Sequence, residues 1–417
     1  MKDILVFKFG GASVKNAEGV KNLWGILKSY EARKYVVVVS AMDKTTNELE
    51  VILKLHQNKA KDQALIRWRE LENRHISILN ELNIGRKESV HVFELFDYGR
   101  SILSSEPTIP SVDYDRIVSI GELLSTRIIE CYISNFEQIK WIDAREIIVT
   151  DSNFRNASIL WEPTGRRVKR AFNSDGIYIT QGFIGADLDG RSTTLGREGS
   201  DYSAAALANI LKAKELTIWK DVPGIKNGDP KVFSNTVLLK RLSYEEAIEL
   251  AYYGASVIHP KTIQPLKEAG IPLHVRSFLE TQNLGTCIDK TNGIEPKVCC
   301  YIRKTEQWLL KLGTYNLSFI SEEHLSHIYS IFHRFSIRVN LSQHSAVQSS
   351  FCINAEYFNE KELMDALNEA FVIELKKGLT LYTLKHATED DVKSLVGTKQ
   401  ILLAQIDLQT HRFILQE

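Results

Sequence analysis

Three segments of the sequence combine glycines with charged residues in a way suited to handling phosphate and carboxylate groups. The first is Lys8-Phe9-Gly10-Gly11, at the end of the apolar run Ile4 to Phe9. Two glycines let a bound group approach the backbone, and exposed N–H groups leading into a helix attract phosphate. Lys8 adds a positive charge at the same place. Standing alone, such a segment is more often an ordinary turn, so its weight depends on the other two.

The second segment is Thr194-Leu195-Gly196-Arg197-Glu198-Gly199-Ser200-Asp201, directly before an alanine-rich helical pattern. We expect Ser200 to cap that helix and Asp201 to lie in its first turn. Capping accounts for both residues without any further function. It does not account for Arg197, whose fixed guanidinium in a glycine-rich loop is suited to holding a carboxylate through two hydrogen bonds.

The third segment runs from Trp219 to Ile225 and continues to Lys231. An apolar run ends there in a turn, where acidic and basic residues gather. Open α/β sheets bind ligands at the carboxyl ends of their strands, so a ligand contact is one interpretation. A plain surface turn is equally consistent with this segment taken by itself.

Several other chemistries lack their sequence signatures. The sequence contains no GxxxxGK[ST] loop, no HRD or DFG set, no HExxH and no CxxC. These absences argue against a P-loop enzyme, a protein kinase and a zinc site. The basic run from Arg166 to Arg170 has no interleaved aromatic residues and is interpreted as a solvated face.

The overall composition predicts a globular cytoplasmic protein with no nucleic-acid or membrane partner. The 417 residues include 52 Lys+Arg and 52 Asp+Glu, so the net charge is zero. A balanced charge disfavours coating of nucleic acid or anionic membranes. No apolar run approaches the ~20 residues of a membrane span, and the N-terminal run is too short for a signal peptide. The five cysteines are an odd number without a disulfide pattern, which favours a reducing compartment.

Up to about residue 294, short apolar runs alternate with amphipathic stretches. This order predicts an α/β domain over 1–294, with helices covering a mostly parallel sheet. Residues from about 55 to 110 are charged and helical, and we interpret them as a helical insertion. The expected strands are Ile4–Phe9, Val36–Ser40, Ile177–Ile184, Leu216–Trp219 and Leu273–Val275, and the clearest helices are Ala64–Asn80, Leu123–Ile133 and Ala204–Leu211.

Residues 295–417 have a different pattern, which predicts two small β-α-β-β units, the second shortened. In the first unit, a helix over Glu322–Phe332 is followed by a strand over Phe335–Leu341, where apolar residues alternate. In the second, Leu379–Leu384 is a strand, and Thr388 with Asp391 resembles a helix-starting cap.

Taken together and in this order, the segments resemble the aspartate kinases of the amino-acid kinase superfamily over nearly the whole chain. The resemblance implies an α/β/α sandwich with a mostly parallel sheet, followed by a C-terminal α+β pair of ACT-like regulatory domains. Its carriers are Lys8-Phe9-Gly10-Gly11, Val39-Ser40-Ala41, Thr45-Thr46-Asn47, Gly121-Glu122-Leu123-Leu124-Ser125, Thr194 to Ala204, Asp221 to Ile225, Tyr253-Gly254-Ala255 and His259-Pro260.

The resemblance implies transfer of the γ-phosphoryl group of MgATP to the side-chain carboxylate of L-aspartate, giving 4-phospho-L-aspartate, the first step toward lysine, threonine and methionine. A carboxylate with a pKa near ~3.9 is already ionised at neutral pH, so the reaction needs no general base. The obstacle is bringing two anions together, which calls for cations and N–H donors around the phosphates.

The resemblance also implies roles for individual residues. Lys8 would neutralise the transferring phosphoryl group, and Asp201 would orient Lys8 or help to hold Mg²⁺. Arg197 would pair with a substrate carboxylate and Glu122 with its ammonium group. Ser40, Thr46 and Ser200 would line the same pocket, although Ser40 and Thr46 are also explained as strand-end and helix-cap residues. The implied nucleotide contacts are Lys8, Phe9, Gly10, Gly11, Lys220, Asp221, Lys226 and Lys231.

Some positions depart from the family pattern. Ala12 stands where the family has Thr or Ser, and Glu198 replaces a glycine beside the implied anion site. Lys226 and Lys231 replace a frequent Tyr and Arg. Ser256 replaces a Lys that contacts ATP in the family, with Lys261 five residues on.

Two alternatives to an active aspartate kinase therefore stay open. One is an amino-acid kinase of altered specificity. The other is a catalytically weak homologue that acts as an amino-acid-sensing or partner subunit, which Glu198 and Ser256 motivate. The retained Lys8 and Asp201 favour an active enzyme.

The C-terminal pair implies a feedback amino acid, lysine or threonine, and a homodimer or higher homo-oligomer. Residues Gln343 to Ala346 depart from the usual strand-end sequence of this module, so regulation is a hypothesis here.

Overall fold

The computed structural model describes residues 4–255, 257–355 and 358–416. These residues form two compact units. The first comprises 4–225, 238–248 and 257–295, and the second comprises 226–237, 249–255 and 296–416. Two short segments of the α/β region thus group with the C-terminal part of the chain.

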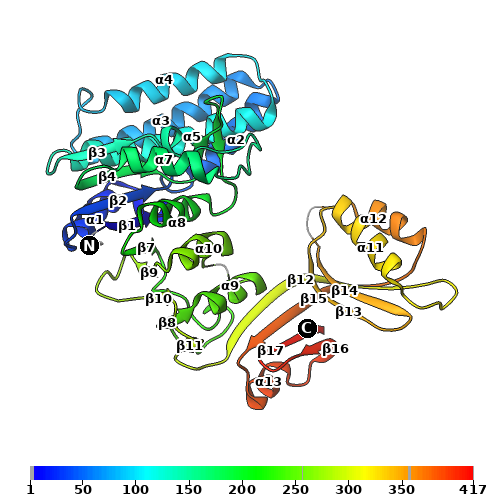
Figure 1. Ribbon diagram of the computed structural model, residues 1–417. Helices are drawn as coiled ribbons and strands as arrows, with labels where there is room; N and C mark the ends of the chain where they lie inside the picture. Colours follow the sequence, from blue (N-terminus) through cyan, green and yellow to red (C-terminus); the bar gives the residue numbers. More distant parts are fainter. Residues whose placement is uncertain (1–3, 256, 356–357, 417) are drawn as a thin grey trace. The chain divides into compact units, whose positions relative to one another are not determined.

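The first unit is built on a nine-stranded, mostly parallel sheet, which confirms the predicted fold class (Figure 1). The four valines Val36–Val39 are fully buried, as expected of a strand covered on both faces. Only the β9/β10 and β8/β11 pairs are antiparallel. In spatial order the strands are β11 (Ile294–Glu295), β8 (Arg241–Ser243), β10 (Thr286–Asp289), β9 (Leu273–Ser277), β7 (Glu215–Lys220), β1 (Ile4–Phe9), β2 (Lys34–Val39), β4 (Gly176–Gln181) and β3 (Ile139–Ile142).

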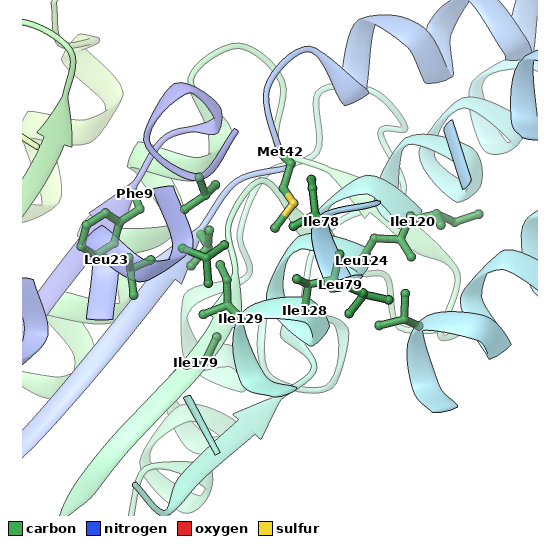
Figure 2. Packing of buried hydrophobic residues seen from close by; sticks show 14 of the residues in the cluster. Phe9, Leu23, Met42, Ile78, Leu79, Ile120, Leu124, Ile128, Ile129 and Ile179 are labelled. Atoms are coloured by element: carbon green, nitrogen blue, oxygen red, sulfur yellow. The ribbon is translucent and has the colours of Figure 1, made fainter. Parts of the chain in front are cut away.

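One face of this sheet carries a large hydrophobic cluster. Phe7, Phe9, Val37 and Val39 point to it from β1 and β2, since alternate side chains of a strand share a face. Figure 2 shows how helix residues such as Ile128 pack on this side. The contributing helices are α1 (Ala17–Lys28), α2 (Thr45–Gln57), α3 (Lys61–Glu81), α4 (Val90–Ser104) and α5 (Pro110–Ile133).

Helix α8 (Gly199–Leu211) packs against β1, β2 and β7 with its alanines fully buried, outside that cluster. It contacts α10 (Pro260–Ala269) and α7 (Trp161–Ala171). The first turn of α8 therefore lies at the carboxyl ends of the central strands. The other elements of this part are η1 (Gly11–Val14), α6 (Ala144–Ile147), β5 (Ile184–Ala186), β6 (Ser192–Thr194) and α9 (Tyr244–Tyr253).

The second unit is built on a six-stranded antiparallel sheet. Its two longest strands are β12 (Cys300–Gly313) and β15 (Val372–Lys385). They pair with each other over most of their length and belong to both halves of the sheet. Helices α11 (Glu322–Arg334) and α12 (Glu360–Asn368) pack on one half, and α13 (Glu389–Val396) on the other. The spatial order is β13 (Val339–His344), β14 (Gln348–Asn354), β12 (Cys300–Gly313), β15 (Val372–Lys385), β17 (Thr410–Gln416) and β16 (Gln400–Ile406).

Two local predictions for this unit have different outcomes. The capping box of Thr388 with Asp391 is confirmed at the start of α13. The strand predicted over Phe335–Leu341 is wrong at its start, because Phe335 ends α11 and Ser336 has a left-handed backbone with φ of 55°. The strand β13 begins only at Val339. No helix among the described residues is long and apolar enough to cross a membrane.

Candidate active site

A cavity of about 520 Å³ opens in the first unit, where β1, β2 and β4 end and α8 begins. All seven residues predicted to be catalytic or substrate-binding line it, including Ser40 after β2 and Thr46 in the first turn of α2. The sequence thus predicted residues that the fold brings together from five separate segments. The lining residues are Lys8, Ser40, Thr46, Asn47, Tyr114, Glu122, Arg155, Phe183, Gly196, Arg197, Glu198, Gly199, Ser200 and Asp201.

An ion pair between β1 and α8 lies at the base of this cavity. The Nζ atom of Lys8 is 2.6 Å from Oδ1 of Asp201, and Nζ of Lys220 is 3.4 Å from Oδ2. Asp201 is fully buried. Burial opposes its ionisation, but the two lysines outweigh this effect and hold its pKa below the usual value. Asp201 is therefore a fixed negative charge that positions two ammonium groups.

Glu122 is the third ionisable residue at the base of the cavity. It lies in the middle of α5 and is only 2% exposed. The Ala41 amide donates to its carboxylate, but its Oε2 atom has no hydrogen-bond partner among the described residues. Burial raises the pKa of Glu122 to about 8, although the charge of Lys8 opposes this shift. A buried carboxyl group with a free oxygen is poised to receive a cationic donor. We call Lys8, Glu122 and Asp201 the cavity floor.

The turn after β1 fits tightly against the loop after β2. The Ser40 amide donates to the Phe9 carbonyl and the Asp43 amide to the Gly11 carbonyl, both at 3.0 Å. A Cβ atom on Gly11 would lie 2.6 Å from the Ala41 carbonyl oxygen, so only glycine allows this approach. The Phe9 side chain is buried in the core, stacked on Trp219, which leaves only its backbone for a nucleotide contact.

The outer part of the cavity carries three exposed charged side chains, those of Arg155, Arg197 and Glu198. No described residue forms a hydrogen bond or ion pair with any of these three charged groups. We call them the cavity rim. Two guanidinium groups are thus free to pair with anions. One belongs to Arg197, for which the sequence predicts carboxylate binding, and the other to Arg155.

The predicted capping role of Ser200 is wrong. Helix α8 begins at Gly199, the residue before Ser200. Its N-cap position is Glu198, whose side chain forms no capping hydrogen bond. Ser200 is already within the helix and lines the cavity, while Asp201 lies in the first turn as predicted. Gly182 sets this position, because a Cβ atom there would lie 2.6 Å from Cβ of Ser200.

The residues predicted to contact nucleotide are more scattered. Lys220 donates to the Val257 carbonyl besides facing Asp201, and Asp221 is exposed just after β7. Lys226 and Lys231 belong to the second unit, on its segment 226–237. Their nucleotide contacts stay predictions. Ser256, the departure that motivated the non-catalytic alternative, lies outside the described residues.

Sequence reasoning assigned no role to several lining residues, chiefly Tyr114, Arg155 and Phe183. Arg155 lies in the polar stretch after Asp151, which has the composition of an ordinary turn. Phe183 falls within the stretch expected to be the strand Ile177–Ile184, which carries no sign of a ligand contact. Asp115 of α5 bonds the Arg155 amide, but this contact joins residues far apart in the sequence and leaves no signal there.

The side chains of the cavity do not form a magnesium site of their own. No group of three or more His, Cys, Asp and Glu side chains among the described residues is arranged to hold a metal. Both carboxylate oxygens of Asp201 face lysines. Magnesium that is held mainly by phosphate oxygens and water needs no such cage, so it fits this cavity as part of a nucleotide.

Comparisons with known proteins point to one family. The amino acid kinase family pattern matches residues 3–277. The chain is 32% identical to aspartokinase 1, chloroplastic, of Arabidopsis thaliana, covering 95% of this chain and 70% of that protein. It is 31% identical to lysine-sensitive aspartokinase 3 of Escherichia coli, covering 92% and 87%.

Solved structures give the same result. The structure of E. coli aspartokinase III in complex with aspartate and ADP aligns with a TM-score of 0.82 at 27% identity, covering 99% of this chain and 96% of that one. Its complex with lysine and aspartate aligns with a TM-score of 0.80 at the same identity and coverage.

Proposed function

Since the chain belongs to the aspartokinases of the amino acid kinase family, we propose that this cavity carries out their reaction on L-aspartate and MgATP. The reaction transfers the γ-phosphoryl group of ATP to the side-chain carboxylate and yields 4-phospho-L-aspartate and ADP. One observation carries the assignment to this cavity. A buried lysine–aspartate pair, a buried carboxyl group with a free oxygen and unpaired guanidinium groups line one space.

The floor supports the phosphoryl-transfer step. An oxygen of the aspartate side-chain carboxylate attacks the γ-phosphorus, and the bond from that phosphorus to the β,γ-bridging oxygen breaks. The ADP oxygen takes the electron pair of the broken bond. Lys8, held by Asp201, would offset the negative charge shared by the two reacting anions. The backbone of Gly10 and Gly11 would let the phosphoryl group approach closely.

The amino-acid end of the substrate would occupy the remaining polar groups. The free oxygen of Glu122 would accept a hydrogen bond from the substrate ammonium, and Arg197 would bind a carboxylate. Ser40, Thr46 and Ser200 add hydroxyl groups on the lining. An α-amino acid with a second carboxylate uses all of these groups at once.

Magnesium would enter with the nucleotide, bound to the ATP phosphates and water, and would neutralise part of their charge. Lys220 and Asp221, at the end of β7, are the residues of the first unit that we assign to the nucleotide side. The nucleotide contacts of Lys226 and Lys231 stay predictions from the sequence. The proposed location is the cytoplasm, where the five cysteines, all free thiols, would stay reduced.

The test is MgATP-dependent formation of acyl phosphate on L-aspartate, trapped with hydroxylamine. Wild type, Lys8→Ala and Arg197→Ala are compared, with Lys15→Ala, an exposed lysine off the cavity, as the matched control. Activity in wild type and the control, with loss in both cavity variants, supports the proposal. A folded wild type that binds aspartate without making acyl phosphate contradicts it and favours a sensing subunit.

We extend the proposal to regulation by the second unit. The related E. coli enzyme has been solved in complex with lysine. Here the two-part antiparallel sheet with its helices would bind a feedback amino acid, lysine or threonine. Saturation binding and inhibition assays with both amino acids test this proposal. If neither lysine nor threonine binds, the proposal is contradicted.

The second unit is also the proposed dimer contact. Leu317 and Phe319, directly before α11, are 76% and 77% exposed, an unusual cost for two large apolar side chains. We expect light scattering to show a homodimer, and we expect Leu317→Ser with Phe319→Ser to weaken it. A wild-type monomer at high concentration contradicts this part.

A further inference from the structure

Two residues of the cavity rim hold a backbone conformation that is uncommon for their type. Arg155 and Glu198 have φ angles of 70° and 56°, in the left-handed region that favours glycine. A side chain with a Cβ atom is strained there, and such strain gathers at functional sites. Both side chains line the cavity, one as a cation and the other as an anion.

The conformation of Arg155 is fixed by a buried acid. Its amide donates to both carboxylate oxygens of Asp115, at 3.1 and 3.0 Å. Asp115 lies in α5, is fully buried, and also accepts hydrogen bonds from the Thr194 amide at 3.0 Å and hydroxyl at 2.7 Å. One carboxylate thus ties the Arg155 loop to both α5 and β6.

The guanidinium group of Arg155 is fixed as well. Its Cζ atom lies 4.3 Å from the centre of the Tyr114 ring, and the Tyr114 hydroxyl donates to Glu50 at 2.8 Å. Stacking on an aromatic face leaves the N–H donors of a guanidinium free at its edge. No described residue accepts a hydrogen bond from them, so this edge is available to a ligand in the cavity.

The position of Arg155 indicates which ligand group it serves. Tyr114 and Glu122 are eight residues apart on α5, which is about 12 Å along a helix axis. Glu122 senses the charge of Lys8, so the Tyr114 end is the end farther from the reacting phosphoryl group. Gly196, next to Arg197, approaches the Arg155 loop, since a Cβ atom on it would lie 2.5 Å from Oδ1 of Asn156. The segments that carry Arg155 and Arg197 therefore meet at the same end of the cavity, which both residues line.

We propose that Arg155 is a specificity-determining residue that binds, beside Arg197, the substrate carboxylate that is not phosphorylated. This inference rests on the proposed function and adds a second guanidinium contact to it. On L-aspartate that group is the α-carboxylate. The pair of arginines then selects substrates that carry two carboxylates, one for each end of the cavity.

The experiment compares Arg155→Gly with wild type on two substrates, L-aspartate and its α-amide, which keeps the ammonium group and the side-chain carboxylate. Glycine suits the φ of 70°, so the variant is expected to melt no lower than wild type. We expect KM for aspartate to rise roughly tenfold to thirtyfold, as for a lost charged hydrogen bond, with kcat and KM for ATP within about twofold. The preference for aspartate over the α-amide should fall by a similar factor.

Arg155→Lys keeps the charge without the fork and should recover only part of the affinity. Arg166→Ala, an exposed arginine of α7 away from the cavity, is the matched control. An unchanged preference between the two substrates overturns the inference, as does a fall in kcat with KM unaltered. Calorimetric binding of aspartate to wild type and Arg155→Gly separates the two proposals, because it tests Arg155 even if wild type makes no acyl phosphate.

Discussion

The cavity floor and the cavity rim both consist of charged residues, but they treat charge in opposite ways. Lys8, Glu122 and Asp201 of the floor are each no more than 7% exposed, and Lys8 and Asp201 neutralise each other. Arg155, Arg197 and Glu198 of the rim are exposed, and no described residue pairs with their charged groups. In the floor, the Lys8–Asp201 pair is neutralised within the protein and Glu122 keeps one free oxygen, whereas none of the three rim charges has a counter-charge among the described residues.

This difference separates two tasks. A charge held in a water-poor site acts strongly and needs no reorganisation when the reaction occurs, which suits transition-state stabilisation. An exposed charge is screened by water and is worth less per contact. It can still discriminate between ligands that carry or lack an anion. We therefore expect substitutions of the Lys8–Asp201 pair to change the rate most, and substitutions of Glu122 and of the rim to change affinity and selectivity.

The largest expected effect is that of Lys8→Ala. Removal of the cation leaves the buried Asp201 with Lys220 alone, and a broken buried pair costs about 3–5 kcal/mol of stability. We expect kcat to fall at least ~10³-fold, as for loss of a preorganised electrostatic contact, and the melting temperature to fall. Lys8→Met keeps the volume and should lose the same activity. If the folded variant has a kcat within tenfold of wild type, the floor does not take part in the chemical step.

The next effect concerns the pH dependence of aspartate binding through Glu122. Burial raises the pKa of Glu122 to about 8, so the free enzyme is mostly protonated there at pH 7. Pairing with the substrate ammonium requires the ionised form, so binding must release a proton. We expect KM for aspartate to fall as pH rises from 6.5 to 8 and to level off above that. Calorimetry in two buffers of different ionisation enthalpy should show release of about one proton at pH 7.

The control for this prediction is Glu122→Gln, which cannot ionise. It should raise KM for aspartate by roughly tenfold to a hundredfold and abolish both the pH dependence and the proton release. If wild type binds aspartate with no proton release, then Glu122 is already ionised or does not meet the ammonium group. Either result would contradict the proposed pairing of Glu122 with the substrate ammonium group.

A third, smaller effect links the two regions through Asp115. Replacement by Asn turns one acceptor into a donor that faces the amides of Arg155 and Thr194. We expect a loss of about 1–3 kcal/mol of stability and a severalfold rise in KM for aspartate, because the rim loop is no longer fixed. Thermal unfolding and kinetics measure both, and Asp113→Asn, at the neighbouring buried acid, is the control. A loss of stability with KM unchanged would mean that Arg155 needs no positioning.

The floor residues, Arg197 and the place of Glu198 beside the cavity could be predicted from the sequence, whereas Arg155 could not, for a physical reason. Lys8, Glu122 and Asp201 stand at fixed places on a strand and two helices, and their neighbours carry family patterns. Arg155 depends on a left-handed backbone position and on hydrogen bonds to the distant Asp115, neither of which leaves a local pattern. The same limit explains Ser200, whose capping role failed because Glu198 adopts φ of 56° and takes the N-cap position two residues earlier.

At the level of the fold, buried valine strands and amphipathic helices predicted the parallel sheet well, since burial on both faces dictates composition. The start of β13 was missed because alternation over Phe335–Leu341 continues through a turn at Ser336. The grouping of 226–237 and 249–255 with the second unit could not be predicted, because it depends on tertiary contacts alone.

The smallest expected effect tests whether the rim is tuned or merely tolerated. Glu198→Gly removes an anion from the end of the cavity where carboxylates bind and places glycine at a left-handed position. The backbone change should leave stability close to that of wild type, because relief of the left-handed strain is offset by the added entropy of glycine in the unfolded chain. Loss of the like charge should lower KM for aspartate by about twofold to fivefold, with kcat little changed, since an exposed charge is screened. Glu198→Gln separates the two causes, because it removes the charge and keeps the strained backbone. A higher KM for both variants would mean that Glu198 contacts the substrate ammonium or orients Arg197. The anion would then contribute to substrate binding by the rim.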